Sequence, residues 1–224
     1  MEQPPATLDP ITSSVIEHGL GSVTDEMANV VVSTAYSPLV RDLYDFTVAL
    51  CNPRGEMVVQ GVGMAIHLGA LPSAVETILA QLGADLRPGD CVIMNDAYEG
   101  GMHLPNVILL TSCFAGSERL GYAVTMAHHT DVGGHVPGSV PVNSRDIFAE
   151  GLRIPPMLLK SSRARWATLP MPDEPPFSER VFERTISSFT SVTARVGLRH
   201  RIFVASVTRV TGARSRDTSN GRLP

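Results

Sequence analysis

The sequence predicts an α+β fold in which a mixed, largely antiparallel sheet is flanked by helices. Apolar residues recur at spacings of three and four within residues 11–31 and 75–82, which is typical of helices that face a core. Short runs of strand-forming residues, separated by turn signals, complete the order helix, hairpin, helix, strand, hairpin. We see no internal repeat.

The two helices have recognisable ends. Asp9-Pro10 is expected to begin the first helix, because proline in a first turn loses no hydrogen bond, and the helix is expected to end before Pro38. The second helix is predicted over residues 72–82, with Gly83 ending it.

The strands form two predicted hairpins and one single strand. Residues 46–51 and 56–60 flank a turn that contains Pro53 and Gly55. Residues 91–94 form a short buried strand. Residues 107–114 and 120–127, joined by a loop at 115–119, form the second hairpin.

Charge divides the chain into two parts. Residues 1–159 carry 6 basic and 17 acidic side chains, whereas residues 160–224 carry 12 basic and 5 acidic ones. The second part has closely spaced prolines and no regular apolar face, so it offers too little surface for burial to offset the entropy of ordering. We therefore predict the N-terminal part of one domain over 1–159 and, over 160–224, a basic tail that is either disordered or a frame-shifted, unrelated continuation. A nucleic-acid-binding arm is not expected, because the aromatic residues of this part are too scattered.

The first residues lack the basic start and apolar core of a signal peptide, and no apolar run approaches the roughly 20 residues that span a bilayer. A cytoplasmic location without a membrane partner is therefore expected. Cys51, Cys91 and Cys113 form no CxxC pair and are interpreted as reduced core residues.

Three histidines indicate a metal site at the ends of strands. His103 and the pair His128-His129 stand beside glycine pairs, and the hairpin over 107–127 would bring His103 and His128 together at its open end. Imidazole and carboxylate ligands suit Zn or Mn. The available carboxylates are Asp45, Asp96 and Asp131. Two ordinary roles compete: a hydrogen-bonded structural histidine, and an Asx turn for any of these aspartates. His67, before the second helix, either orients a substrate or is a buried structural residue.

Several catalytic motifs are missing from the sequence. It contains no HExxH, no GxxxxGK[ST] phosphate loop, no GxGxxG after a strand and no GxSxG elbow. Nucleotide binding within this chain and catalysis by a protein nucleophile are therefore disfavoured.

Residues 9–159 closely resemble the hydantoinase B/5-oxoprolinase family, which includes N-methylhydantoinase B and the alpha subunits of acetone carboxylase. The motifs that carry the resemblance occur in the same order and spacing as in the family. They include Asp45-Phe46-Thr47-Val48, Ile66-His67-Leu68-Gly69, Asn95-Asp96-x-Tyr98-x-Gly100-Gly101-x-His103-Leu104-Pro105, Ala127-His128-His129-x-Asp131-Val132-Gly133-Gly134 and Glu150-Gly151-Leu152-Arg153-Ile154-Pro155-Pro156.

The resemblance implies a B-type subunit that works with a hydantoinase A-type partner. The partner uses ATP to phosphorylate a carbonyl or enol oxygen, and the B-type subunit completes the reaction at a divalent metal. It implies metal ligands at Asp45, His103, position 106 and His128. Position 106 is Asn106 where the family has aspartate, so a neutral oxygen replaces a carboxylate and weaker binding is expected.

The remaining site predictions are catalytic roles for His129 and Asp131 and a substrate-binding role for His67. Family members continue for several hundred residues past Pro156, and the resemblance is lost at about Lys160. We therefore expect a truncated B-type subunit of an ATP-dependent cyclic-amide hydrolase, with activity of the chain alone doubtful. The alternatives are an acetone carboxylase alpha-like subunit and a non-catalytic interaction remnant.

Overall fold

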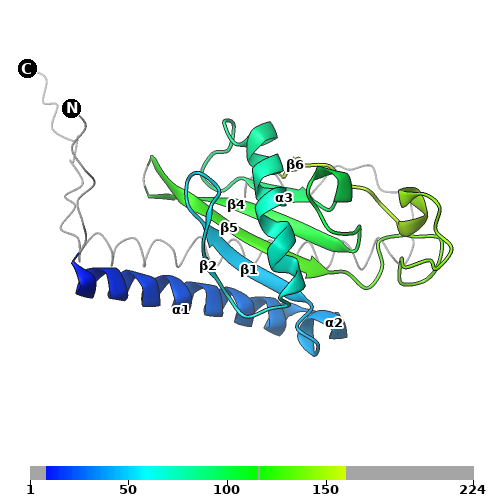
Figure 1. Ribbon diagram of the computed structural model, residues 1–224, viewed down its shortest axis with the longest axis horizontal. Coiled ribbons are helices and arrows are strands. Elements are labelled where there is room, and N and C mark those ends of the chain that lie inside the picture. The colour runs from blue at the N-terminus through cyan, green and yellow to red at the C-terminus, as the bar shows by residue number, and fades with distance from the viewer. Residues whose placement is uncertain (1–8, 116, 160–224) are drawn as a thin grey trace, which may run out of the picture.

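The computed structural model of the chain describes residues 9–115 and 117–159. The predicted disordered tail over 160–224 lies outside the described residues. Figure 1 shows the arrangement of the helices and strands.

The centre of the fold is one six-stranded sheet with the strand order β2-β1-β5-β4-β3-β6. All of its recorded pairings are antiparallel, which confirms the predicted fold class. The strands are β1 (Phe46–Cys51), β2 (Met57–Gln60), β3 (Cys91–Met94), β4 (Asn106–Ala115), β5 (Glu118–His128) and β6 (Met157–Leu159). The sequence did not predict β6, which has only three residues and extends the sheet beyond β3.

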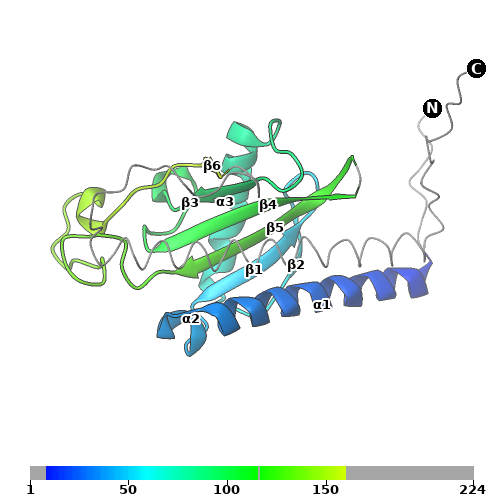
Figure 2. The same cartoon turned by 180° about the vertical axis from the view of Figure 1, so that it is seen from behind.

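Two long helices lie on opposite faces of this sheet, as the front and back views show (Figures 1 and 2). Helix α1 (Pro10–Thr34) begins at Asp9, whose carboxylate accepts hydrogen bonds from the amides of Ile11 and Thr12 at 3.0 Å. Helix α3 (Ile66–Leu82) begins six residues before the predicted start, so that Pro72 lies inside it. The short elements are α2 (Pro38–Arg41), η1 (Ala97–Glu99) and η2 (Ile147–Glu150).

Each face of the sheet has its own apolar core, because successive side chains of a strand point to opposite faces. Met27 and Val31 of α1 pack in the cluster that contains Phe46 and Val48. Helix α3 contributes to the other cluster, whose fully buried members include Ala74, Ile78, Val92, Met94, Ile108, Leu110, Val124 and Met126. Ala123 packs in the first cluster and Val124 in the second, so a shift of β5 by one residue would move each side chain into the wrong core.

The loop between β2 and α3 runs very close to the start of β1. A Cβ atom at Gly63 would lie 2.3 Å from the Phe46 carbonyl oxygen and 2.8 Å from the Thr47 Cα, so only glycine fits there. The amide of Met64 donates to the Phe46 carbonyl at 2.8 Å. This close approach brings the first turn of α3, with His67, beside the residue that precedes β1.

Among the residues that the structure describes, no helix is long and apolar enough to cross a membrane.

Candidate functional site

Three adjacent strands bring polar side chains together at one end of the sheet. Asp45 immediately precedes β1, Asn106 is the first residue of β4, and His128 is the last residue of β5. Strand β5 lies between the other two, with Ala127 opposite Phe46 and His128 opposite Asn106. The register of the sheet therefore places all three side chains side by side.

The donor atoms of these residues are close together. His128 Nδ1 lies 3.0 Å from Asn106 Oδ1 and 3.8 Å from Asp45 Oδ2. Two ligand atoms bound to one ion at about 2.1 Å each lie roughly 3.0–3.4 Å apart for octahedral to tetrahedral angles. The 3.0 Å distance from His128 to Asn106 falls within that range, and the 3.8 Å distance to Asp45 is longer.

Two further histidines border this group. The His103 and His128 rings have centroids 5.0 Å apart, so the loop before β4 carries His103 to the position that the hairpin argument predicted. His67 is 2% exposed, and its Nε2 lies 3.2 Å from Asp45 Oδ1 and 3.5 Å from Asn106 Nδ2. From the sequence, His67 was predicted to bind substrate and not metal, whereas the structure brings it into contact with two predicted metal ligands, Asp45 and Asn106.

The His67 and His128 side chains are favoured in their neutral forms. Burial lowers the pKa of both His67 and His128, the nearby Asp45 carboxylate opposes that shift, and neighbouring histidines, His103 among them, add to it. Neutral imidazole is the form that binds a metal.

The backbone before β1 is strained next to Asp45. Tyr44 has a φ of 57°, in the left-handed region that side chains other than glycine, asparagine and aspartate rarely adopt. Its ring stacks on Phe46 with a centroid separation of 6.1 Å. Asp45 itself is held by the bond from its amide to the Leu39 carbonyl and by the bond from the His128 amide to its own carbonyl.

The predicted catalytic residues lie just beyond β5. His129 is 3% exposed, with Nδ1 3.2 Å from the Ala127 carbonyl, and burial lowers its pKa to about 4. Asp131 accepts hydrogen bonds from the amides of Gly133 and Gly138 and from the Ser139 hydroxyl, at 2.7, 3.1 and 2.7 Å. Although burial opposes it, these bonds lower the Asp131 pKa. Asp131 thus closes the loop after β5, and the catalytic roles of both residues stay predictions.

The sequence left Asp96 as a candidate carboxylate or an Asx-turn residue and gave no role to Arg153 or Met102, whereas the structure shows all three near the His103 loop. Asp96 is 1% exposed; its Oδ1 accepts from the Tyr98 amide at 3.0 Å and its Oδ2 from Arg153 Nε at 2.5 Å. Met102 contributes its sulfur, 3.5 Å from Asn106 Nδ2. The adjacent polar pair Asn95-Asp96 after a buried strand was the available signal.

The donor chemistry fits a divalent cation, with a carboxylate, an amide oxygen and imidazoles. Over residues 9–115 and 117–159, however, no three histidine, cysteine or acidic side chains are grouped so that they could hold an ion. An ion here would therefore depend on the neutral oxygen of Asn106 or on a small movement of His103.

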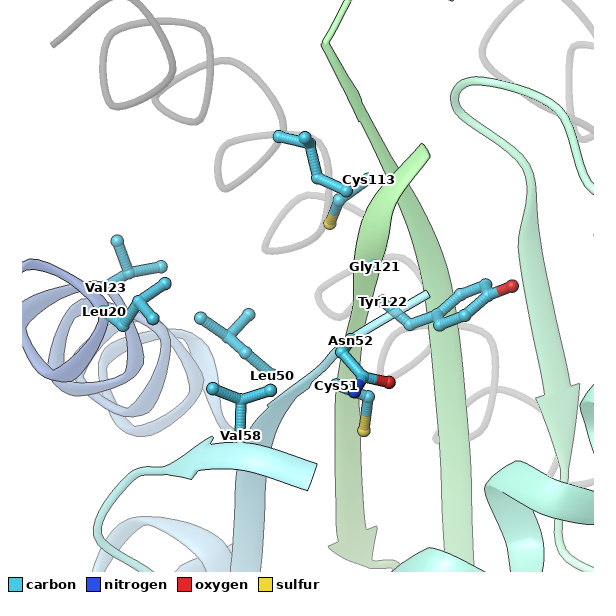
Figure 3. A pocket seen from close by; sticks show the side chains of 10 residues that line it. Leu20, Val23, Leu50, Cys51, Asn52, Val58, Cys113, Gly121 and Tyr122 are labelled. Atoms are coloured by element: carbon cyan, nitrogen blue, oxygen red, sulfur yellow. The ribbon is translucent and has the colours of Figure 1, made fainter. Parts of the chain in front are cut away.

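A separate apolar cavity of about 240 Å³ lies away from this site, where α1 passes the far ends of β1 and β5 (Figure 3). Leu20 and Val23 of α1 face Leu50 and Val58 of the sheet across it. The residues that line it include no histidine and no acidic side chain, so the cavity lacks the groups that the candidate site assembles.

Comparison with solved structures supports the fold. The ATP-dependent caprolactamase from Pseudomonas jessenii superimposes with a TM-score of 0.73 at 24% identity, over 92% of this chain and 35% of that one. A nucleotide-free acetone carboxylase structure superimposes with a TM-score of 0.66 at 18% identity, over 92% of this chain and 26% of that one.

Comparison of sequences identifies relatives much longer than this chain. An uncharacterized protein of Methanocaldococcus jannaschii is 36% identical over 68% of this chain and 28% of its own length. The beta subunit of the Pseudomonas jessenii caprolactamase is 33% identical over 68% of this chain and 26% of its own length. The 5-oxoprolinase of Dictyostelium discoideum is 33% identical over 66% of this chain and 12% of its own length.

The sequence pattern of one family, hydantoinase B/oxoprolinase, matches residues 9–171, well over half of the chain. The strand-end residues Asp45, Asn106 and His128 and the six-stranded antiparallel sheet all lie inside that match. The chain therefore belongs to the hydantoinase B/oxoprolinase family.

Proposed function

We propose that this chain supplies the metal-binding strand ends of a B-type subunit in an ATP-dependent cyclic-amide hydrolase. The observation that carries the proposal is the meeting of Asp45, Asn106 and His128 at one end of the sheet, with distances from His128 Nδ1 of 3.0 and 3.8 Å. The 33% identity to a caprolactamase beta subunit and to a 5-oxoprolinase supports the reaction class.

In this proposal Asp45, His103 and His128 bind Zn or Mn, and Asn106 adds a neutral oxygen. The ion, when bound, supplies a Lewis acid that polarises a substrate oxygen or a water molecule. His67 binds the substrate in this proposal, and its buried ring also lies 3.2 Å from the Asp45 carboxylate and helps to hold it in position.

The roles of His129 and Asp131 follow from their protonation. With a pKa of about 4, His129 is neutral near pH 7, the form in which a histidine can accept a proton, and its low basicity makes it a weak acceptor. Asp131 orders the loop that follows His129 through its bonds to Gly133 and Ser139. We therefore propose that His129 is the proton acceptor and that the loop ordered by Asp131 supports it.

The partner in this proposal is an A-type subunit that uses ATP, in a cytoplasmic complex. The sequence contains no phosphate loop of the GxxxxGK[ST] type, in agreement with a division of labour between two subunits. Carboxylation of an enol phosphate and a non-catalytic role are the competing possibilities. The caprolactamase subunit favours hydrolysis, since the likeness to acetone carboxylase rests on the fold alone.

Elemental analysis of the purified full-length chain tests the metal. We expect about one equivalent of Zn or Mn, lost in His103→Ala because only Asp45, His128 and the weakly binding neutral oxygen of Asn106 would remain. His18→Ala is the matched control, because His18 is an exposed residue of α1 whose ring nitrogen lies 2.8 Å from the Ser14 carbonyl of the same helix. Equal metal content in all three proteins would exclude His103 as a ligand.

A further inference from the structure

Asn95 is a fully buried amide between β3 and η1, and its side chain joins three segments. Its Nδ2 donates to the carbonyls of Leu104 at 2.7 Å and Leu152 at 2.8 Å, and its Oδ1 accepts from the Ile154 amide at 2.6 Å. The backbone amide of Asn95 also donates to the Ile154 carbonyl at 3.0 Å. Both amide hydrogens and the amide oxygen are thus used in a space where water does not compete.

One of these bonds ends beside a predicted metal ligand. Leu104 follows His103 directly and is itself 0% exposed. The His103 carbonyl accepts from the Asn106 amide at 2.9 Å, and the carbonyl of Pro105 accepts from the His129 amide at 2.8 Å. The loop that presents His103 is therefore anchored on one side by β4 and β5 and on the other by Asn95.

We propose that Asn95 is a positioning residue for His103, an inference that rests on the proposed metal site. Without Asn95 the Leu104 carbonyl loses a buried donor, and the loop is free to carry His103 away from His128, whose ring centroid lies 5.0 Å away. Asn95 touches neither the ion nor the substrate. Its effect on the site passes through the backbone of Leu104.

Asn95→Asp is the sharpest test, because it keeps the size of the side chain and replaces the donating amide with an oxygen that faces two carbonyls. Asn95→Ser is a second variant that adds no charge and is too short to reach both carbonyls. Ser112→Ala is the matched control, since it also removes a buried bond from a side chain to a carbonyl, that of Arg87 at 2.8 Å. Ser112 pairs with Tyr122, toward the end of the sheet opposite the site.

Two measurements on the full-length chain read out the position of His103. In metal-free protein, ring resonances in two-dimensional NMR should move for His103 in both Asn95 variants and stay in place in Ser112→Ala. In titrations with Co²⁺, both Asn95 variants should bind about 10–100-fold more weakly than the unchanged chain, the range typical of residues that orient a ligand. The control should stay within about twofold, and the Co²⁺ absorption bands should shift only in the Asn95 variants.

Unchanged His103 resonances together with unchanged Co²⁺ affinity would overturn the inference. Loss of the folded state in both Asn95 variants would also overturn it, because Asn95 would then act in folding and not in positioning. If the unchanged chain binds no Co²⁺, the proposed function fails, while the metal-free resonances still decide whether Asn95 positions His103.

Discussion

Replacing Asn106 by aspartate adds a second carboxylate to the candidate site, and its consequences can be worked from the structure. Asn106 is 1% exposed, with Oδ1 3.0 Å from His128 Nδ1, and Asp45 Oδ2 lies 3.8 Å from the same nitrogen. The two carboxylate oxygens would therefore be separated by no more than about 7 Å. With an effective dielectric constant of about 20, their repulsion is about 2–3 kcal/mol.

Without metal, this repulsion should lower the free energy of unfolding of Asn106→Asp by about 2 kcal/mol near pH 7. The repulsion raises the pKa of one carboxyl above its unfolded value, so the lost stability should return as the pH falls through that raised pKa. A divalent ion reverses the sign, because it neutralises both charges. We expect the variant to bind Mn or Zn at least about 10-fold more tightly, which corresponds to about 1.4 kcal/mol.

Competition against a chelator of known affinity measures the metal binding, and urea unfolding with and without the ion measures the stability. Asn143→Asp is the control, since it makes the same chemical change at an exposed position of the loop after β5. Equal or weaker metal binding by Asn106→Asp would place position 106 outside the coordination of the ion and refute the reasoning.

Three further predictions concern neighbouring residues. Gly63→Ala should lower the free energy of unfolding by about 1–3 kcal/mol or more, as read by urea unfolding, because its Cβ would meet the Phe46 carbonyl at 2.3 Å; Gly21→Ala, where a Cβ meets nothing within 4 Å, is the control. The pKa of His129, about 4 in the folded chain, lies below its unfolded value of about 6.5. The contribution of His129 to the free energy of unfolding is therefore complete above pH 6.5 and is lost as the pH falls toward 4. That loss amounts to roughly 3 kcal/mol. The free energies of unfolding at pH 7.5 and 4.5 should differ less in His129→Phe than in the unchanged chain. Equal differences in the two proteins would contradict the lowered pKa of His129. His67→Gln should keep the bound metal and weaken substrate binding, seen as a higher KM in the reconstituted complex. Loss of the metal on elemental analysis would contradict the substrate-binding role and leave support of Asp45 as the role of His67.

The local signals of the sequence were enough to predict most of the sheet. Strand β1 has the predicted bounds, and β4 and β5 form the predicted hairpin, since short runs of strand-forming residues and the turn between them are local features. Helix α3 starts before the predicted start at Pro72, because burial of His67 and Leu71 extends the helix toward its N-terminus. Strand β6 is only three residues long, and its pairing with β3 depends on distant contacts.

The candidate site also contains one contact that the sequence predicts and others that it does not. The approach of His103 to His128 followed from hairpin geometry and needed only the spacing of the two residues. The approach of His67 to Asp45 depends on how α3 crosses the sheet, which is set by the close contact of Gly63 with Phe46 and Thr47. No periodic pattern encodes that contact. Asn95, which anchors the His103 loop, likewise bonds to residues that are distant in the sequence. Leu152 lies 57 positions away and Ile154 lies 59 positions away.

Tyr44, the residue before Asp45, has a left-handed conformation, so a substitution that stabilises the chain at this position would also make it less ordered. Glycine at position 44 would adopt a φ of 57° without steric cost and would relieve strain on the order of 1 kcal/mol. It would also remove the ring that stacks on Phe46 and widen the range of directions in which the chain enters β1. An engineer who selected only for thermal stability would be drawn to this substitution. The selected protein would then present the Asp45 carboxylate in many orientations in place of one.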